Sequence, residues 1–152
     1  MSATRVTQFV NAPRERVYGA LLDAAAVAKW KVPDGMTCQV HEFDARQGGF
    51  FRVSLTYDAP EAAGKTSAHT DTYHGWFVEL VPNERVVETV EFETADPALE
   101  GKMTITTTLT DRNGGTEIVG LHDGLPTGVP PEDNEQGWRM ALAKLAALVE
   151  AG

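Results

Sequence analysis

Hydrophobic residues recur along the chain with two different periods, and the change of period divides it into segments. Between residues 17 and 22 they are spaced three and four apart, which is typical of a helix with one buried side. A short strand over 4–10 precedes this helix, and a second short helix over 24–30 follows it. From residue 37 to residue 122 the period is two, which predicts strands.

Residues with specific local preferences mark the ends of the first elements. Asn11 or Ala12 is expected at the cap of the first helix, with Pro13 in its first turn, where the missing N–H has no partner. Asp23 is expected to cap the second helix, which Pro33 terminates.

The region with period two contains six predicted strands. In one of them Phe51, Val53, Leu55 and Tyr57 alternate with polar residues, so these four side chains share a face. Asn113-Gly114 is a strong signal for a tight hairpin turn. Because the connections are short, we expect an antiparallel meander. The strands are predicted near 37–43, 51–57, 67–81, 86–92, 103–109 and 117–122.

The last segment is predicted to be a long amphipathic helix that covers one face of the sheet. It starts at about Asp133, and its apolar residues from Trp138 to Val149 follow the three-and-four spacing. The order is strand, two helices, six strands and a long helix. This order predicts a single α+β domain over residues 1–152.

Charge and composition narrow the classes of partner and the compartment. The net charge is −9, from 22 acidic and 13 basic residues without a basic block, so nucleic acid and anionic membrane surfaces are not expected partners. No apolar run approaches the roughly 18 residues that cross a bilayer, and no signal peptide is recognisable. Cys38 is the single cysteine, which agrees with a reducing, cytoplasmic location and is interpreted as a half-buried strand residue.

Short motifs occur in a fixed order over nearly the whole chain. They are Ala12-Pro13, Arg16-Val17-Tyr18, Trp30 with Pro33, Asp44 with Arg46, Gly48-Gly49 and Arg52, Gly75 with Pro82, Glu84 and Arg85, Gly115-Thr116, His122-Asp123-Gly124, and Gly137-Trp138 with Leu142 and Leu145. In this order they resemble the AHSA type (activator of Hsp90 ATPase homologue) of the SRPBCC superfamily, also called START-like or Bet v-like. The resemblance implies a helix-grip fold, in which a curved antiparallel sheet wraps around the C-terminal helix and encloses a cavity.

Aromatic residues are the main candidates for lining such a cavity. Rings offer rigid apolar faces and phenols offer a polar end, although each ring could instead fill the core. The candidate ligand-binding residues are Trp30, Phe51, Val53, Leu55, Tyr57, Tyr73, His74, Trp76, Phe92, Ile105, Trp138 and Leu142.

The histidines do not form a convincing metal site. His69 and Asp71 share a face of one strand, but His74 should point to the opposite face, and zinc needs three or four convergent ligands. His122 is interpreted as orienting the turn at Gly124. We therefore expect no metal and no other cofactor.

Two further motifs are interpreted as structural. Asp44 is expected to accept hydrogen bonds from the backbone of the Gly48-Gly49 turn, which leaves Arg46 at the surface. Gly137 costs about 1 kcal/mol relative to alanine inside a helix, and close packing against the sheet is favoured over room at a pocket mouth. No nucleophile motif or phosphate-binding loop is present, so no catalytic residue is assigned.

Three functions remain open. The first is non-catalytic binding of a small hydrophobic, lipid-like or aromatic ligand by a monomer or homodimer. In that case Gly75→Leu is expected to block the cavity and spare the fold. The second is a cyclase- or aromatase-like enzyme that uses His74 or Tyr73 as a polar group inside the cavity. The third is a co-chaperone that stimulates the Hsp90 ATPase, as the family name implies.

Overall fold

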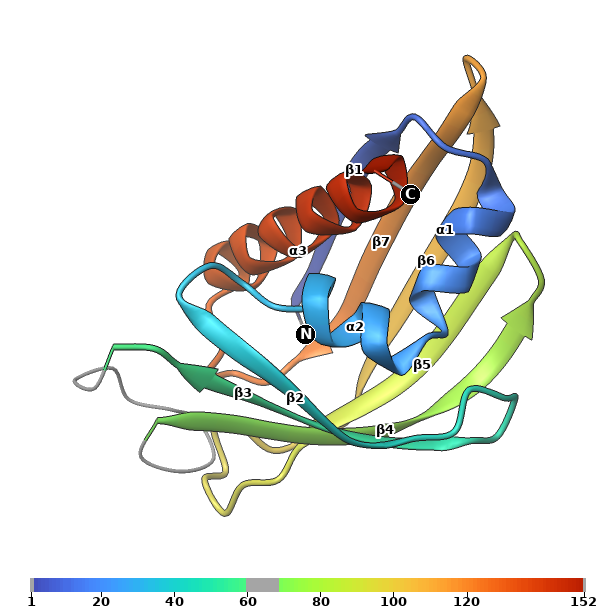
Figure 1. Ribbon diagram of the computed structural model, residues 1–152. Coiled ribbons are helices and arrows are strands. Elements are labelled where there is room, and N and C mark those ends of the chain that lie inside the picture. Colours follow the sequence, from blue (N-terminus) through green and yellow to red (C-terminus); the bar gives the residue numbers. More distant parts are fainter. Residues whose placement is uncertain (1, 60–68, 152) are drawn as a thin grey trace.

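The computed structural model describes residues 2–59 and 69–151, which form a seven-stranded antiparallel sheet and three helices (Figure 1). The order of strands across the sheet is β1-β7-β6-β5-β4-β3-β2. The strands are β1 (Ser2–Val10), β2 (Met36–Phe43), β3 (Phe50–Tyr57), β4 (Thr70–Val81), β5 (Arg85–Phe92), β6 (Met103–Arg112) and β7 (Gly115–Leu125). The helices are α1 (Arg14–Leu21), α2 (Ala24–Trp30) and α3 (Pro131–Ala151).

The sheet curls into a half-barrel, and α3 lies along its concave side (Figure 1). The register shifts between Val40 and Glu42 in β2 and between Phe77 and Glu79 in β4. Such irregularities bend a strand and increase its twist. The helices α1 and α2 connect β1 with β2, the two edge strands of the sheet. The predicted helix-grip fold is confirmed.

Two local predictions are also confirmed. The carboxylate of Asp23 accepts a hydrogen bond from the backbone N–H of Ala25 at 3.2 Å, so Asp23 caps α2. Asn113 and Gly114 have φ angles of 49° and 81° between β6 and β7. Two positive φ angles in succession are the feature of the hairpin turn that Asn-Gly favours.

The predicted cap of α1 is wrong. The N-cap residue is Pro13, in extended conformation and without a side-chain hydrogen bond to the helix. The carbonyl of Ala12 accepts a hydrogen bond from the Thr116 hydroxyl at 2.7 Å, and the N–H of Asn11 donates to the Glu150 carboxylate at 2.8 Å. Both residues therefore anchor this segment to β7 and α3, and the helix begins after them.

Several boundaries differ by a few residues from the sequence pattern, and β1, β6 and β7 are longer than predicted. The helix α3 begins at Pro131, two residues before the predicted start, because proline is tolerated in the first turn. The strand predicted from residue 67 is observed as β4 from Thr70, and residues 67 and 68 lie outside the described residues. No helix in the described parts of the chain is long and apolar enough to cross a membrane.

The two halves of α3 meet the sheet differently. In the C-terminal half, Leu142, Leu145 and Val149 are almost completely buried in the hydrophobic core. In the N-terminal half, Gly137 and Trp138 face an internal cavity instead. The functional candidates are therefore at the N-terminal end of α3.

Candidate functional site

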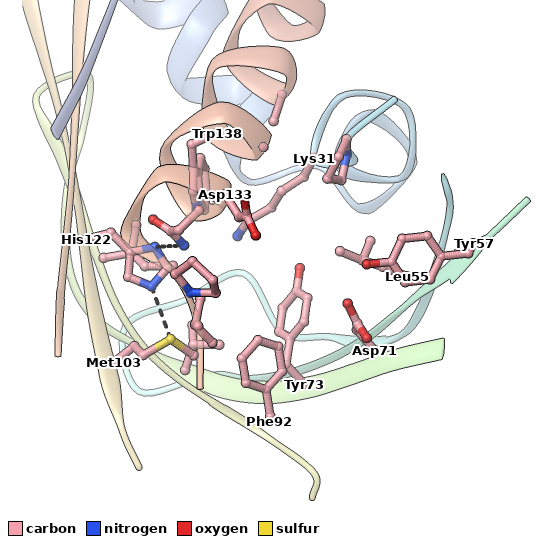
Figure 2. Close-up of a pocket in the computed structure, with 18 residues that line it drawn as sticks. Lys31, Leu55, Tyr57, Asp71, Tyr73, Phe92, Met103, His122, Asp133 and Trp138 are labelled. Atoms are coloured by element: carbon pink, nitrogen blue, oxygen red, sulfur yellow. Dashed lines mark hydrogen bonds between the residues drawn. The ribbon is translucent and has the colours of Figure 1, made fainter. Parts of the chain in front are cut away.

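A cavity of about 340 Å³ lies between the concave face of the sheet and the N-terminal half of α3 (Figure 2). Strands β3 to β7 form its floor, and residues just after α2 form part of its rim. The lining residues are Lys31, Pro33, Leu55, Tyr57, Asp71, Tyr73, Val90, Phe92, Met103, Ile105, His122, Val129, Pro130, Asp133, Asn134, Gly137, Trp138 and Ala141.

The structure brings several of the predicted ligand-binding residues together at this cavity. They come from four strands and from α3, because inward-facing positions on neighbouring antiparallel strands lie side by side. They are Leu55, Tyr57, Tyr73, Phe92, Ile105 and Trp138.

Other predicted residues face inward but fill the core. The ring of Phe51 packs on Phe77 at a centroid distance of 5.0 Å and is 1% exposed. The indole N–H of Trp30 donates to the carbonyl of Ala20 at 3.0 Å, which fixes α2 against α1. Val53 is equally buried in the core. These side chains do not line the cavity.

Leu142 is a core residue that does not line the cavity. Its side chain is 1% exposed and borders a separate void of about 10 Å³, together with Ile105, His122 and Trp138. A void of this size is at the lower limit for a single water molecule. Leu142 therefore belongs to the closely packed core beside the cavity.

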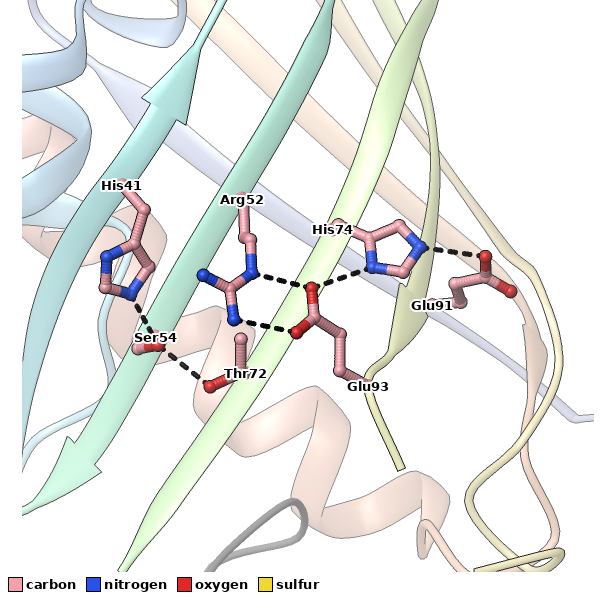
Figure 3. Close-up of polar contacts among 7 residues, drawn as sticks. All are labelled: His41, Arg52, Ser54, Thr72, His74, Glu91 and Glu93. Atoms are coloured by element: carbon pink, nitrogen blue, oxygen red, sulfur yellow. Dashed lines mark hydrogen bonds and ion pairs between the residues drawn. The ribbon is translucent and has the colours of Figure 1, made fainter. Parts of the chain in front are cut away.

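His74 and Trp76 lie on the convex face of the sheet and do not reach the cavity. Neighbouring residues of a strand point to opposite faces, so Tyr73 and His74 cannot both face the cavity. The two ring nitrogens of His74 are each 2.9 Å from a carboxylate oxygen, one of Glu91 and one of Glu93 (Figure 3). Trp76 is 37% exposed. His74 is therefore excluded as the polar group inside the cavity.

The convex-face cluster continues to Arg52. Its guanidinium binds the Glu93 carboxylate with two hydrogen bonds of 2.8 and 2.9 Å (Figure 3). These bonds hold the pKa of Glu93 below its ordinary value, against the effect of partial burial, and His74 adds to the lowering. The cluster links β3, β4 and β5 on the outer surface, so its role here is structural.

The first hairpin differs from its sequence-based interpretation. The Asp44 carboxylate binds the side chain of Arg46 at 2.7 Å. The turn is closed by backbone bonds from the N–H of Arg46 to the carbonyl of Asp44 and from the N–H of Gly49 to the carbonyl of Arg46. Arg46 is at the surface, as expected, but the partner of the Asp44 carboxylate is Arg46 and not the turn backbone. This ion pair is exposed and contributes little to stability.

Gly75 is a close-packing position, so the expectation for Gly75→Leu is wrong. A Cβ atom there would lie 2.0 Å from the carbonyl oxygen of Thr89 and 2.8 Å from the ring of Phe51.

Even Gly75→Ala should lower the free energy of unfolding by about 1–3 kcal/mol, because the strands must move apart. Urea unfolding would measure this. Gly19→Ala is the matched control, since a Cβ there meets nothing within 4 Å, and equal effects of the two substitutions would contradict the prediction.

Gly137 has the opposite environment. A Cβ atom at this position would meet only Pro33, at 3.6 Å, which is an ordinary van der Waals contact. The interpretation of Gly137 as a close-packing residue is therefore wrong. Its missing side chain leaves room in the cavity, at the expense of helix stability.

Lys31 and Glu88 form an ion pair beside the cavity. The Lys31 ammonium lies 2.9 Å from Oε1 of Glu88, and the two side chains are 12% and 6% exposed. The ammonium also lies 5.5 Å from the ring centroid of Phe51 and 5.8 Å from that of Trp138. The cation is therefore held by a buried carboxylate and two aromatic faces.

Tyr73 and His122 supply uncharged polar groups to the cavity. Burial raises the pKa of Tyr73 well above 10, with Cys38 and Glu88 adding to the effect, so the phenol is protonated at neutral pH. Burial lowers the pKa of His122 from 6.5 to about 4, and Lys31 adds to the lowering, so the imidazole is neutral. Figure 2 shows the Tyr73 hydroxyl pointing into the cavity.

Sequence reasoning missed His122 and Lys31 as cavity residues. His122 was interpreted as orienting a turn, but its ring contacts Met103 and Asn134 inside the fold. The available signal was that His122 shares strand parity with Ile118, an apolar residue that faces the core. Nothing in the local sequence pairs Lys31 with Glu88.

The buried His122 should make stability depend on pH. Its folded pKa of about 4 is below the ordinary 6.5, so the unfolded chain binds more protons between these values. The contribution of the neutral His122 ring to the free energy of unfolding is complete above pH 6.5. It is lost as the pH falls toward 4, at up to about 1.4 kcal/mol per pH unit. Urea unfolding at several pH values should show this decline in the wild type. His122→Phe should lose that part of the slope, and identical slopes for both proteins would contradict the prediction.

The cavity combines apolar surface with a few polar groups. Polar donors stand in an otherwise largely apolar cavity, which is typical of small-molecule sites. Burial raises the pKa of the Cys38 thiol, which disfavours the reactive thiolate. Within 2–59 and 69–151, no group of three His, Cys, Asp or Glu side chains is placed to hold a metal ion.

Several solved structures share the fold of this protein. A protein of Chromobacterium violaceum is 38% identical, with a TM-score of 0.88 over 97% of this chain and 96% of that chain. A protein of Arthrobacter aurescens is 13% identical, with a TM-score of 0.81 over 99% of this chain and 87% of that chain. DynU16, a protein of the dynemicin biosynthetic locus, is 21% identical, with a TM-score of 0.69 over 99% of this chain and 48% of that chain.

The sequence also matches a protein family over most of its length. No curated protein matches the sequence. Residues 11–150 match the family described as Activator of Hsp90 ATPase homolog 1-like protein, which covers α1, α2, six strands and nearly all of α3. The chain therefore belongs to the Activator of Hsp90 ATPase homolog 1-like family.

Proposed function

We propose that the protein binds a small hydrophobic molecule in the cavity between the sheet and α3, without transforming it. The observation that carries this proposal is the cavity of about 340 Å³ that residues of five strands and of α3 line. This volume is within the range of roughly 300–1,000 Å³ that is usual for ligand sites. Burial of apolar ligand surface would supply about 25 cal/mol per Å².

The side chains favour a flat or elongated apolar ligand with a polar end. Leu55, Phe92, Ile105 and Trp138 provide apolar contact surface from the sheet and from α3. The phenol of Tyr73 provides a hydrogen bond. An aromatic or lipid-like molecule with one polar group would match both kinds of surface.

Trp138 gives a direct test of this proposal. The neutral fluorescent probe N-phenyl-1-naphthylamine should bind in the cavity and quench tryptophan fluorescence. Trp138→Phe should remove most of the quenching, whereas Trp76→Phe should keep it, since Trp76 lies on the convex face. Native mass spectrometry of freshly purified protein would show a co-purified molecule. Quenching that depends on Trp76 and not on Trp138 would refute the cavity as the binding site.

A second candidate is a cyclase- or aromatase-like enzyme acting in the same cavity. The observation that favours it is the presence of Lys31, Tyr73 and His122 at the cavity wall, because such groups could polarise carbonyls of a folded chain. A binding protein returns a poly-ketone ligand unchanged, whereas a cyclase changes its mass.

The family description also names activation of the Hsp90 ATPase, which a stimulation assay with purified Hsp90 would test.

A further inference from the structure

A chain of hydrogen bonds fixes the orientation of His122 at the cavity wall. The Thr4 hydroxyl donates to Oδ1 of Asn134 at 2.5 Å, and Nδ2 of Asn134 lies 3.2 Å from Nδ1 of His122. On its other side, Nε2 of His122 lies 3.2 Å from the sulfur of Met103. Thr4 and His122 are direct partners across β1 and β7, so three strands and α3 together hold the ring.

The hydrogen-bond partners of the ring favour one of its two nitrogens as the carrier of the proton. A thioether sulfur can only accept, so the Nε2 atom of His122 can hydrogen-bond to Met103 only as a donor. The amide of Asn134 uses its oxygen for Thr4 and presents its N–H to Nδ1, which must therefore accept. The contacts with Met103 and with Asn134 both favour a neutral imidazole with its proton on Nε2.

The Nε2–H group has a weak partner that a ligand could replace. Sulfur is a poor acceptor, and the methionine side chain is flexible enough to move aside. His122 and Met103 both line the cavity (Figure 2). A ligand oxygen placed near them would exchange a weak N–H···S contact for a stronger N–H···O bond.

The charges around the cavity disfavour an anionic ligand. Among the described lining residues Lys31 is the one lysine or arginine, and it is already paired with Glu88 at 2.9 Å. A carboxylate that approached Lys31 would also approach the carboxylate of Glu88, and Asp133 adds a further acidic group at the wall. Desolvation of that anion would not be repaid by a free cation.

We propose that the cavity selects an uncharged apolar ligand with an acceptor oxygen, such as a ketone or quinone carbonyl, and that Nε2–H of His122 donates to this oxygen. The inference rests on the proposed function and specifies the ligand class for the same cavity. The protonated hydroxyl of Tyr73 is a second uncharged donor in the wall. A fatty acid carboxylate is thereby a poorer ligand than a ketone of similar shape.

Three naphthalenes of similar shape test the inference by calorimetry. They are 2-acetylnaphthalene, which carries a ketone, 2-ethylnaphthalene, which has no polar group, and 2-naphthoate, which is an anion. The ketone should bind at least about tenfold more tightly than the carboxylate. His122→Phe keeps a ring of similar size and should weaken the ketone about tenfold, the upper range for one neutral hydrogen bond. The same substitution should leave 2-ethylnaphthalene within about twofold.

The outcomes separate the two proposals. If 2-ethylnaphthalene binds and His122→Phe weakens the ketone no more than the hydrocarbon, the role of His122 is overturned and the binding function stands. If neither neutral compound binds, the binding function is overturned as well. Nitrogen NMR of the wild-type His122 ring is independent of any variant. A proton on Nδ1 in the free protein, or an Nε2 signal that the ketone does not shift, would also overturn the inference.

Discussion

Gly137→Leu should abolish binding of N-phenyl-1-naphthylamine while the protein stays folded. The new side chain would extend from α3 into the cavity, where a Cβ atom meets only Pro33 at 3.6 Å. We expect affinity to fall at least about tenfold, since displacement of the ligand from part of the cavity needs to remove only about 1.4 kcal/mol for this loss. Fluorescence titration would measure it.

The same substitution should not destabilise the protein. Replacing a helical glycine recovers about 0.5–1 kcal/mol of helix propensity, so urea unfolding should show equal or greater stability. Gly19→Leu is the matched control, because Gly19 is also helical, is exposed on α1 and has nothing within 4 Å of an added Cβ. It should bind the probe like the wild type. Unchanged binding by Gly137→Leu would place the probe outside this cavity.

Lys31→Met should cause a large loss of stability. Removal of the ammonium leaves the carboxylate of Glu88, which is 6% exposed, without its cation. Breaking a buried pair in this way costs about 3–5 kcal/mol. Urea unfolding at pH 7 would measure the change in the free energy of unfolding.

Two further variants show whether the loss comes from an uncompensated charge. The double variant Lys31→Met with Glu88→Leu should recover most of the stability, because it leaves no buried charge unpaired. Arg85→Met is the control, since it breaks a pair with Glu79 whose side chains are 42% and 46% exposed. It should cost about 1 kcal/mol or less. A double variant as unstable as Lys31→Met would show that packing, and not charge, is decisive.

Local sequence signals predicted most helices and strands, because capping and turn residues act on backbone groups within a few residues. Asp23 caps α2 through a backbone group two residues away. Asn113 and Gly114 form their hairpin because they tolerate the positive φ angles that it requires. The cap of α1 was misplaced because Asn11 and Ala12 bond to Glu150 and Thr116, more than a hundred residues away.

Strand parity predicts which face a side chain takes, and the prediction of two cavity residues, His74 and Trp76, did not follow it. Phe51, Val53, Leu55 and Tyr57 were expected on one face of β3. Of these, Leu55 and Tyr57 line the cavity and Phe51 and Val53 are buried in the core. By the same rule, His74 could not accompany Tyr73 into the cavity.

The cavity itself was predicted through family resemblance, since a pattern of apolar positions does not say where packing is incomplete. Along β3, the change from core to cavity depends on what lies opposite each position. The C-terminal half of α3 fills the space with Leu142 and Leu145, while Gly137 leaves it open. That difference appears only when the helix is placed against the sheet.

The sequence by itself determined the helix-grip order of elements, because hydrophobic period, caps and turn residues act over a few positions. The tertiary structure alone decided the chemistry of the cavity. It joined Lys31 to Glu88 and set His122 between Asn134 and Met103, across separations of 57, 12 and 19 residues. Burial and charge pairing depend on which distant segments meet, and curvature of the sheet around α3 brings them together.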